Sequence, residues 1–453
     1  MISIQMNEQL TREFKEKTTS AQQAVRLINN GDIVYIGTCS SVAYGLLEAL
    51  WRRKEELEDV TLTGGLLINP VDALCEGNFK LMTYFIGPVE RKRMNKAGFD
   101  FTSVHLSQTD IWIKETARPN TAFFEVSLPD ENGYMSYGAG GAGVGTHVKD
   151  IVDTVILQIN KRAPYVYGDN NLIHVSEADS IVCYDSELPE APEAPEDETI
   201  SSIANFLLEH IDDGACIQLG IGSIANAVGY RLRDKNDLGA HTEIITDSMM
   251  ELMKLGVLNG SRKNFFPGKV ATAVAFGSAA LYNYLDHNEN VYFLPFSELN
   301  SPLNIAKNND MISINSAISM DLFGQVSSES IAGKQYSGTG GQLDYVIGAQ
   351  LSKGGKSFLA VQSTVDNRSG GTASRIVSQF PPGTIVTTPR SETQYVVTEY
   401  GCVNLKPLTM RDRVKAMISL AHPDFRPQLL EEAKTILTSD PYGKNLTAST
   451  GNA

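Results

Sequence analysis

The chain alternates short apolar runs with stretches of helical spacing along most of its length. Near the start, 19–29 has apolar positions at helical intervals behind a capping residue, and 31–37 is a short apolar run bounded by glycines, typical of a buried strand. A further helix is predicted at 42–53 and a further strand at 60–63, and the rhythm continues to a strand at 123–127. This alternation predicts a largely parallel sheet with helices on its faces.

The C-terminal part predicts two strands followed by two helices. The apolar runs 383–389 and 394–399 indicate a strand pair, and helical spacing returns at 411–422 and 426–437. The last residues, 441–453, show neither pattern, so we expect a flexible tail there.

One stretch, 186–198, is rich in proline and acidic residues and has almost nothing apolar to bury. Such a composition is typical of a linker between domains. We therefore expect an N-terminal domain at 1–185 and a C-terminal domain at 199–440.

The two sides of this linker carry related sequences, which indicates an internal duplication. The matching blocks are 31–40 with 214–223, 130–136 with 321–327 and, with no gap after that, 153–156 with 344–347. The two halves are therefore predicted to be similar open α/β domains. In this alignment Glu243 of the second half corresponds to about Leu62 of the first, so an acid would be present in one copy only.

Composition and charge exclude several classes of function. At 453 residues the chain is long enough for two or three domains, and its formal charge of −15 argues against a nucleic-acid partner, although a local basic pocket stays open. Its five cysteines form no C-x-x-C pair, which fits a reducing compartment. We find no apolar signal-peptide core and no run long enough to span a membrane, so we expect a cytoplasmic protein with no membrane partner.

A glycine turn and an acid follow neighbouring predicted strands in the second half. The apolar run 214–219 ends in Gly-Ile-Gly and continues into small residues that suit a helix start, so its N–H groups could face an anion or an oxyanion. Glu243 lies in the next predicted strand, 239–248. Because parallel sheets bind ligands beyond the carboxyl ends of their strands, we expect the turn and Glu243 to share one crevice.

These residues carry a resemblance to a known family. The stretch from Gln218 to Val228 and the triplet His241-Thr242-Glu243 resemble motifs of the acetyl-CoA hydrolase/transferase family, and in particular of its butyryl-CoA:acetate and 4-hydroxybutyrate CoA-transferases. The resemblance implies a class I CoA-transferase fold of the NagB/RpiA-like kind, with Glu243 carrying first the acyl group and then coenzyme A. Ser223 replaces a usual glycine. The turn that would contact the coenzyme consists of Gly220, Ile221, Gly222, Ser223 and Ile224.

The same resemblance implies further coenzyme contacts in the second half. Gly340 and Gly341 belong to a glycine-rich loop whose backbone could approach a ligand closely. Lys356 falls where the family has a basic contact for coenzyme A, and an ammonium group suits a phosphate, although a solvated surface lysine is the alternative. Asn300 is a further implied contact.

Two other acids compete with Glu243 for the catalytic role. A lone glutamate is most often an exposed surface residue, so Glu243 is singled out only by the turn, the one-sided duplication and the motif together. Glu329 and Glu399 also lie in family-like stretches, but neither follows a glycine turn that could supply oxyanion donors, so we expect both to be structural. The seven histidines show no ligand spacing, so no metal is predicted.

The resemblance implies transfer of coenzyme A between an acyl-CoA and a short-chain carboxylate. The stretch from Ile86 to Arg93 looks more like the butyryl-CoA:acetate enzymes, so we expect butyryl-CoA and acetate, with 4-hydroxybutyrate or propionate as alternative substrates. A hydrolase of the same fold and a non-catalytic metabolite-binding module also stay open. We expect no tightly bound cofactor, coenzyme A as substrate and transient covalent adduct, and a homo-oligomer, either a dimer or a tetramer.

Overall fold

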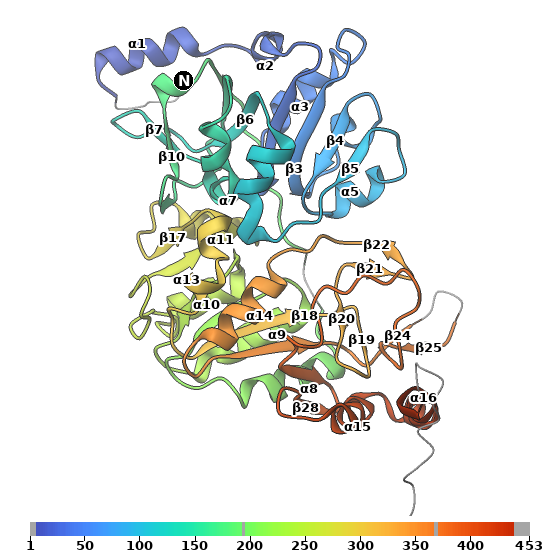
Figure 1. The fold of residues 1–453 in the computed structure, drawn as a ribbon. Coiled ribbons are helices and arrows are strands. Elements are labelled where there is room, and N and C mark those ends of the chain that lie inside the picture. The colour runs from blue at the N-terminus through green and yellow to red at the C-terminus, as the bar shows by residue number, and fades with distance from the viewer. Residues whose placement is uncertain (1–5, 193–194, 367–369, 439–453) are drawn as a thin grey trace, which may run out of the picture.

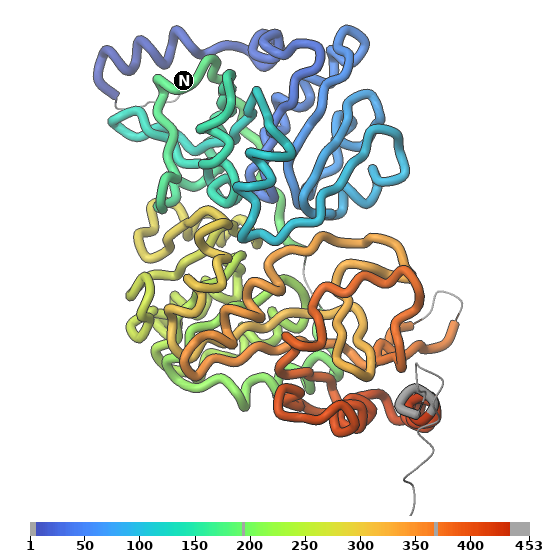
Figure 2. The backbone as a smooth tube through the Cα atoms, viewed as in Figure 1, coloured from blue at the N-terminus to red at the C-terminus, as the bar shows by residue number. Residues whose placement is uncertain are grey.

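The protein consists of two stacked α/β halves in a computed structural model, which describes residues 6–192, 195–366 and 370–438. The first half runs from blue to green in Figures 1 and 2, and the second half continues from green to red beneath it. Across these described residues, no helix is both long and apolar enough to cross a membrane.

The first half is built on an eight-stranded sheet with the order β11-β8-β6-β1-β3-β4-β5, in which β2 pairs with β1. All of its pairings are parallel except that of β1 with β2. Its strands are β1 (Ile33–Cys39), β2 (Ser41–Val42), β3 (Thr61–Leu67), β4 (Lys80–Thr83), β5 (Phe99–Phe101), β6 (Thr121–Val126), β8 (Thr154–Ile159) and β11 (Ser180–Cys183). Its helices are α1 (Glu8–Lys17), α2 (Ala21–Ala24), α3 (Tyr44–Trp51), α4 (Asp72–Cys75), α5 (Pro88–Arg93), α6 (Thr109–Ile111) and α7 (Gly138–Lys149).

The second half repeats this plan around the sheet order β13-β12-β18-β23-β27-β28, which is parallel up to its last pair. The strands of this sheet are β12 (Cys216–Leu219), β13 (Gly239–Ala240), β18 (Met311–Ser316), β23 (Lys356–Ala360), β27 (Tyr395–Thr398) and β28 (Gly401–Asn404). The helices of this half are α8 (Glu198–Leu208), α9 (Ser223–Arg231), α10 (Asp247–Lys254), α11 (Ala279–Leu285), α12 (Phe296–Leu299), α13 (Pro302–Ile305), α14 (Gln342–Leu351), α15 (Met410–Leu420) and α16 (Arg426–Thr438).

Shorter strands complete both halves and join them. They are β7 (Tyr134–Ser136), β9 (Tyr167–Gly168), β10 (Leu172–His174), β14 (Ile244–Ile245), β15 (Val270–Thr272), β16 (Val274–Ala275), β17 (Val291–Phe293), β19 (Ser319–Asp321), β20 (Val326–Ser327), β21 (Ser330–Ile331), β22 (Lys334–Gln335), β24 (Thr364–Asp366), β25 (Thr372–Ser374) and β26 (Ile376–Val377). Strand β9 of the first half pairs with β17 of the second, so hydrogen bonds cross between the halves.

The duplication is visible in strand order and in local turn chemistry. Strands β3, β1, β6, β8 and β11 of the first sheet follow one another as β13, β12, β18, β23 and β27 do in the second. Asp130 Oδ1 accepts hydrogen bonds from the N–H groups two and four residues later, and Asp321 Oδ1 does the same. Each turn also has a glycine at positive φ, Gly133 at 83° and Gly324 at 85°. The predicted pair of similar domains is therefore confirmed.

The ungapped last block of the predicted alignment is wrong. Residues 154–156 begin β8, whereas 344–347 lie inside α14, because the second half reaches its equivalent strand only at β23. The sheet registers also change the position of the first half that is equivalent to Glu243. Thr61 lies beside the start of β1 as Gly239 lies beside the start of β12, so Glu243 corresponds to Gly65 rather than Leu62. The acid is still present in one copy only.

Two other predictions need correction. Residues 383–389 form no strand beyond one bridge between Thr388 and Val326, because this segment bonds through its side chains and N–H groups to 326–330, and β27 pairs with β28 instead. In the linker, Leu188 is buried against the core of the second half. The linker residues before α8 are otherwise neither helix nor strand where described, and the predicted tail, 441–453, lies outside the described residues.

Candidate active site

The glycine turn after β12 leads directly into α9. Gly222 precedes the helix with a φ of 116°, a conformation that L-residues with a side chain rarely adopt. The helix begins at Ser223, so the N–H groups of its first turn have no acceptor within the helix. A β-carbon at Gly222 would meet no atom within 4 Å. The N–H groups that follow Gly220 therefore face open space, as an anion or oxyanion site requires. The Gly220 N–H is not available for this role, because it donates to Ile314 O at 3.2 Å.

Glu243 lies between β13 and β14, with its backbone fixed on both sides. Its carbonyl oxygen accepts hydrogen bonds from Ala273 N at 3.2 Å and Val274 N at 3.1 Å. The neighbouring Thr242 hydroxyl donates to Leu219 O at 3.2 Å, the residue just before the glycine turn. The predicted meeting of Glu243 with the turn at the carboxyl edge of the sheet is thus supported by a direct link between their neighbours.

The His241 side chain connects the same segment to Asn300. His241 is fully buried, and its Nε2 atom lies 2.7 Å from Leu299 O, the carbonyl next to Asn300. Burial and, to a smaller extent, the charge of Lys263 lower the pKa of His241 to about 3. The imidazole is therefore neutral across the physiological range, and Nε2 carries the proton that it donates to Leu299. His241 therefore joins its own segment to Leu299 through a hydrogen bond and does not act as an acid or base.

The Glu243 carboxylate is held by groups from two other elements. Asn300 Nδ2 donates to Glu243 Oε2 at 3.0 Å. A β-carbon at Gly341 would overlap both of these atoms, so only glycine leaves room for this arrangement. Asp344, one turn further along α14, lies close enough for its charge to act on Glu243. The structure therefore brings together Glu243, Asn300 and the Gly340–Gly341 turn.

The surroundings make Glu243 an unusual acid. Its side chain is half-buried, and burial raises the pKa of Glu243 to about 7, against the hydrogen bond from Asn300 and with the charge of Asp344. A carboxylate poorly stabilised by solvent is a stronger nucleophile than a surface acid. This site can therefore attack an electrophilic carbonyl and hold the resulting oxyanion at a glycine turn.

The first half forms the opposite wall of the site. Phe85 would contact a β-carbon placed at Gly338 or Gly340, and Leu106 N donates to Gly340 O at 3.2 Å. Ser107 Oγ donates to Asp344 at 2.7 Å. The first half thus contacts the glycine-rich loop directly.

Comparisons with known proteins decide which family this site belongs to. The acetyl-CoA hydrolase/transferase N-terminal domain matches residues 1–191, and the C-terminal domain of that family matches residues 277–433. The 4-hydroxybutyrate coenzyme A transferase of Clostridium kluyveri is 37% identical over 428 residues, which cover 93% of this chain and 98% of that protein. The chain belongs to the acetyl-CoA hydrolase/transferase family.

Two further relatives agree with this assignment. The butyryl-CoA:acetate CoA-transferase of Anaerostipes caccae is 34% identical over 435 residues, covering 93% of this chain and 97% of that protein. The crystal structure of RipA from Yersinia pestis superposes with a TM-score of 0.88 at 32% identity, covering 94% of this chain and 99% of that one. The predicted fold and the predicted enzyme class are confirmed at the level of the family.

The rival acids of this family member have their carboxylates occupied. Glu329 is buried and accepts hydrogen bonds from Thr387 Oγ1 at 3.0 Å and from Gln335 Nε2 at 3.2 Å. Glu399 accepts from both the backbone N–H and the hydroxyl of Ser363. These bonds fit the structural role that we expected for both acids.

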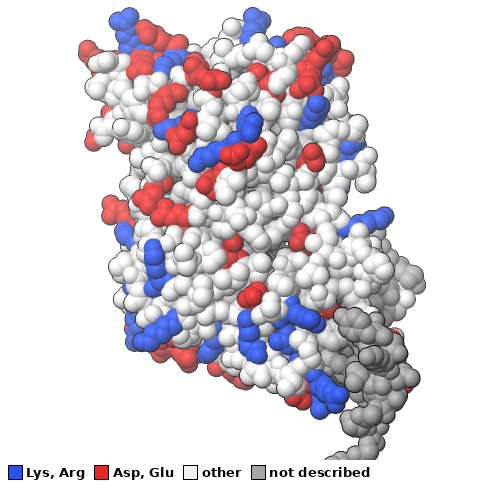
Figure 3. All heavy atoms as spheres, in the orientation of Figure 1, with Lys and Arg blue, Asp and Glu red and all other residues white. Residues whose placement is uncertain are grey.

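The structure does not bring the predicted site residue Lys356 to Glu243. Lys356 begins β23, level with Ile312 and hence with Ile217, three residues before the glycine turn. That offset is roughly 10 Å along the strands. Its Nζ atom donates to His210 O at 3.2 Å. On the face in Figure 3, acidic and basic side chains are mixed over both halves, and several basic ones lie close together over the lower part of the second half.

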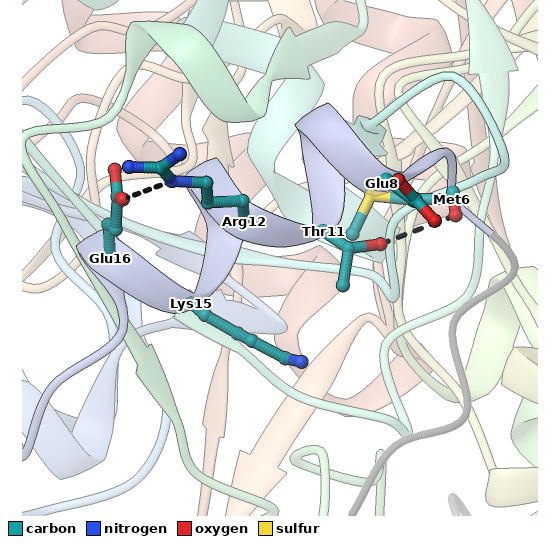
Figure 4. A pocket seen from close by; sticks show the side chains of 6 residues that line it. All are labelled: Met6, Glu8, Thr11, Arg12, Lys15 and Glu16. Atoms are coloured by element: carbon teal, nitrogen blue, oxygen red, sulfur yellow. Dashed lines mark hydrogen bonds and ion pairs between the residues drawn. The ribbon is translucent and has the colours of Figure 1, made fainter.

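Two hollows of the molecule are unrelated to this chemistry. The one drawn in Figure 4 lies along α1, where Arg12 pairs with Glu16 and Thr11 bonds to Met6 O, so its lining comes from one exposed helix and from Met6 just before it. Another lies between α3 and α4. Among the described residues, no group of three or more His, Cys, Asp or Glu side chains could hold a metal ion.

Sequence reasoning missed Ser107 and Asp344. Asp344 directly follows the glycine-rich loop already singled out, so an acid in the first turn of the next helix could have been noticed from the sequence. Ser107 gave no signal, because it meets Asp344 across 237 residues of sequence.

Proposed function

We propose that the protein transfers coenzyme A from a short-chain acyl-CoA to a carboxylate through a glutamyl-CoA thioester on Glu243. The observation that carries this proposal is the Glu243 carboxylate, with its raised pKa, held by Asn300 against the Gly341 backbone. Its neighbour Thr242 bonds to Leu219, the residue just before the glycine turn. The family membership supports the same reaction.

The proposed reaction needs no proton transfer. A Glu243 oxygen attacks the thioester carbon, the C–S bond breaks, and an acyl-glutamyl anhydride and CoA thiolate form. The thiolate then attacks the glutamyl carbonyl and releases the first carboxylate, which leaves the glutamyl-CoA thioester. A second carboxylate attacks that thioester and expels the thiolate, which finally attacks the new acyl carbonyl and frees Glu243.

The glycine turns have a defined part in this sequence. Each attack creates a tetrahedral oxyanion, which N–H groups of Ile221, Gly222, Ser223 and Ile224 and of the Gly340–Gly341 turn would stabilise by about 3 kcal/mol per donor. Gly220 would contribute only backbone contact, because its N–H already donates to Ile314 O. The same backbone surfaces would contact the coenzyme. Lys356 stays a prediction as a phosphate contact, because the coenzyme would have to extend to its edge of the sheet.

We propose butyryl-CoA and acetate as the substrate pair. The support is the likeness of the stretch from Ile86 to Arg93 to the butyryl-CoA:acetate enzymes. Because Ile86, Glu90 and Arg93 are fully buried, this stretch acts only as a marker of relationship. Relatives of similar identity are named for 4-hydroxybutyrate and for butyryl-CoA with acetate, so 4-hydroxybutyrate and propionate are the alternatives to test. Initial rates with C3 to C6 acyl-CoAs and with 4-hydroxybutyryl-CoA, each with acetate, would decide among them.

The covalent step is tested by intact-protein mass spectrometry after mixing with acyl-CoA and no acceptor, followed by peptide mapping. We expect a CoA adduct on Glu243 in the wild type and none in Glu243→Ala, while the matched variant Glu399→Gln still forms it. An adduct on Glu329 or Glu399 would refute the assignment, and an activity independent of Glu243 would favour a binding module. Release of free CoA without acceptor, at the rate of transfer, would favour the hydrolase.

A further inference from the structure

The Asp344 carboxylate is tied to both halves of the protein. It lies in the first turn of α14 and is 5% exposed. Its two oxygens accept hydrogen bonds from Ser107, one from the hydroxyl at 2.7 Å and one from the backbone N–H at 3.1 Å. The side-chain amide of Asn300 lies close enough to Asp344 to lower its pKa. Asp344 is therefore bonded to the first half and lies beside the residue that holds Glu243.

The Asn300 amide consequently lies between two carboxylates. Its Nδ2 atom carries two hydrogens, and it donates to Glu243 Oε2 at 3.0 Å while the amide also lies beside Asp344. Its Oδ1 atom is buried and has no hydrogen-bond partner among the described residues. If the amide were reversed, this oxygen would face two carboxylates and repel both. The two acids together therefore fix the N–H side of Asn300 toward Glu243.

The charge of Asp344 changes the pKa of Glu243. Burial raises the pKa of Asp344 to about 6, opposed by the bonds from Ser107 and by the charge of His105. The Asp344 charge in turn raises the pKa of Glu243. The other titratable group facing both acids is Tyr345, whose own pKa is raised mainly by burial, so it stays neutral. Asp344 is thus the negatively charged group that raises the pKa of Glu243, and it lies beside the Asn300 amide that holds the Glu243 carboxylate.

We propose that Asp344 is a positioning residue for the transfer reaction, which keeps the Asn300 amide oriented and the Glu243 carboxylate aimed, while Ser107 anchors it to the first half. This inference rests on the proposed role of Glu243 as the nucleophile. It gives the first half a part in catalysis although that half carries no acid equivalent to Glu243. Asp344 itself does not touch the reacting atoms.

The test is the pH profile of kcat/KM for acyl-CoA with saturating acetate. In the wild type, the rate should fall below about pH 7, because protonated Glu243 cannot attack. Asp344→Asn removes the negative charge, so the pKa of Glu243 falls and this acidic limb should move down by about one pH unit. The released Asn300 should also lower kcat by about tenfold at pH 8, because the nucleophile is less well aimed.

The matched control is Glu329→Gln, which neutralises another buried acid of the second half that does not contact Asn300. Its acidic limb should stay at the wild-type pH. A merely structural role for Asp344 would lower the rate at every pH and leave the limb in place, and that result would overturn the inference.

Two further measurements keep the outcome decisive. If Asp344→Asn does not fold, Ser107→Ala retains the acid and removes only the 2.7 Å bond. We expect it to lower kcat at least threefold with the KM unchanged, and an unchanged kcat would refute the anchoring role. Adduct formation separates the two hypotheses. If the wild type forms no CoA adduct, the proposed function is refuted. If the adduct forms but the acidic limb of the pH profile does not move in Asp344→Asn, only this inference is refuted.

Discussion

Gly341→Ala tests the geometry of the site most directly, because the added methyl group meets the nucleophile itself. A β-carbon at Gly341 would lie 1.9 Å from Glu243 Oε2, and real β-carbons essentially never approach another atom within 3.0 Å. The carboxylate would have to move by about 1.1 Å. Backbone strain would not contribute to the loss of activity, because alanine readily adopts the φ of −101° found at Gly341.

A displacement of this size at a reacting atom costs about a hundredfold in rate. We therefore expect Gly341→Ala to lower kcat for CoA transfer about a hundredfold and to slow adduct formation on Glu243 in parallel. The thermal midpoint should change by only a few degrees, because the methyl group enters the site and not the core.

The matched control is Gly77→Ala, whose β-carbon would approach no atom closer than 3.8 Å. It should leave both kcat and the thermal midpoint near wild type. If Gly341→Ala kept kcat within about twofold of wild type, the carboxylate could not lie where the structure has it, and the reasoning about Asn300 and Asp344 would fall with it.

Three other expectations follow from the same structure. Glu243→Asp shortens the nucleophile by one methylene, so transfer should fall about a hundredfold while slow release of free CoA begins, as water enters the gap; a variant with wild-type transfer would contradict this. Lys356→Ala should raise the KM for acyl-CoA with kcat unchanged if the coenzyme phosphates reach it, and an unchanged KM would leave Lys356 as a surface charge. Burial raises the pKa of Glu125 to about 8, so it is protonated in the folded protein, and stability present below about pH 4.5 is lost as the pH rises toward 8. Glu125→Gln should therefore raise the thermal midpoint by a few degrees at pH 8 and by much less at pH 5, and equal shifts at both would rule out this titration.

The sequence by itself was sufficient for features that depend on neighbouring residues. The strand, glycine turn and helix around Gly222 follow from an apolar run and from a conformation that only glycine adopts easily. The matching turns after Asp130 and Asp321 form because each aspartate side chain bonds to the backbone of the residues that follow it. This local pattern allowed the duplication to be recognised in the sequence. The candidate acid, Glu243, was identified from its motif because the triplet keeps its spacing in the chain.

Only the tertiary structure decided which groups surround that acid. Asn300 reaches Glu243 across 57 residues, and Ser107 reaches Asp344 across 237, so no local pattern could pair them. The same limit explains the errors. Residues 383–389 are apolar enough for a strand but bond instead to a segment distant in sequence. The predicted alignment of the two halves fails at 344–347 because helix α14 precedes the next strand there. Local propensity sets which elements form, whereas the raised pKa of Glu243 exists only because the folded halves remove it from water.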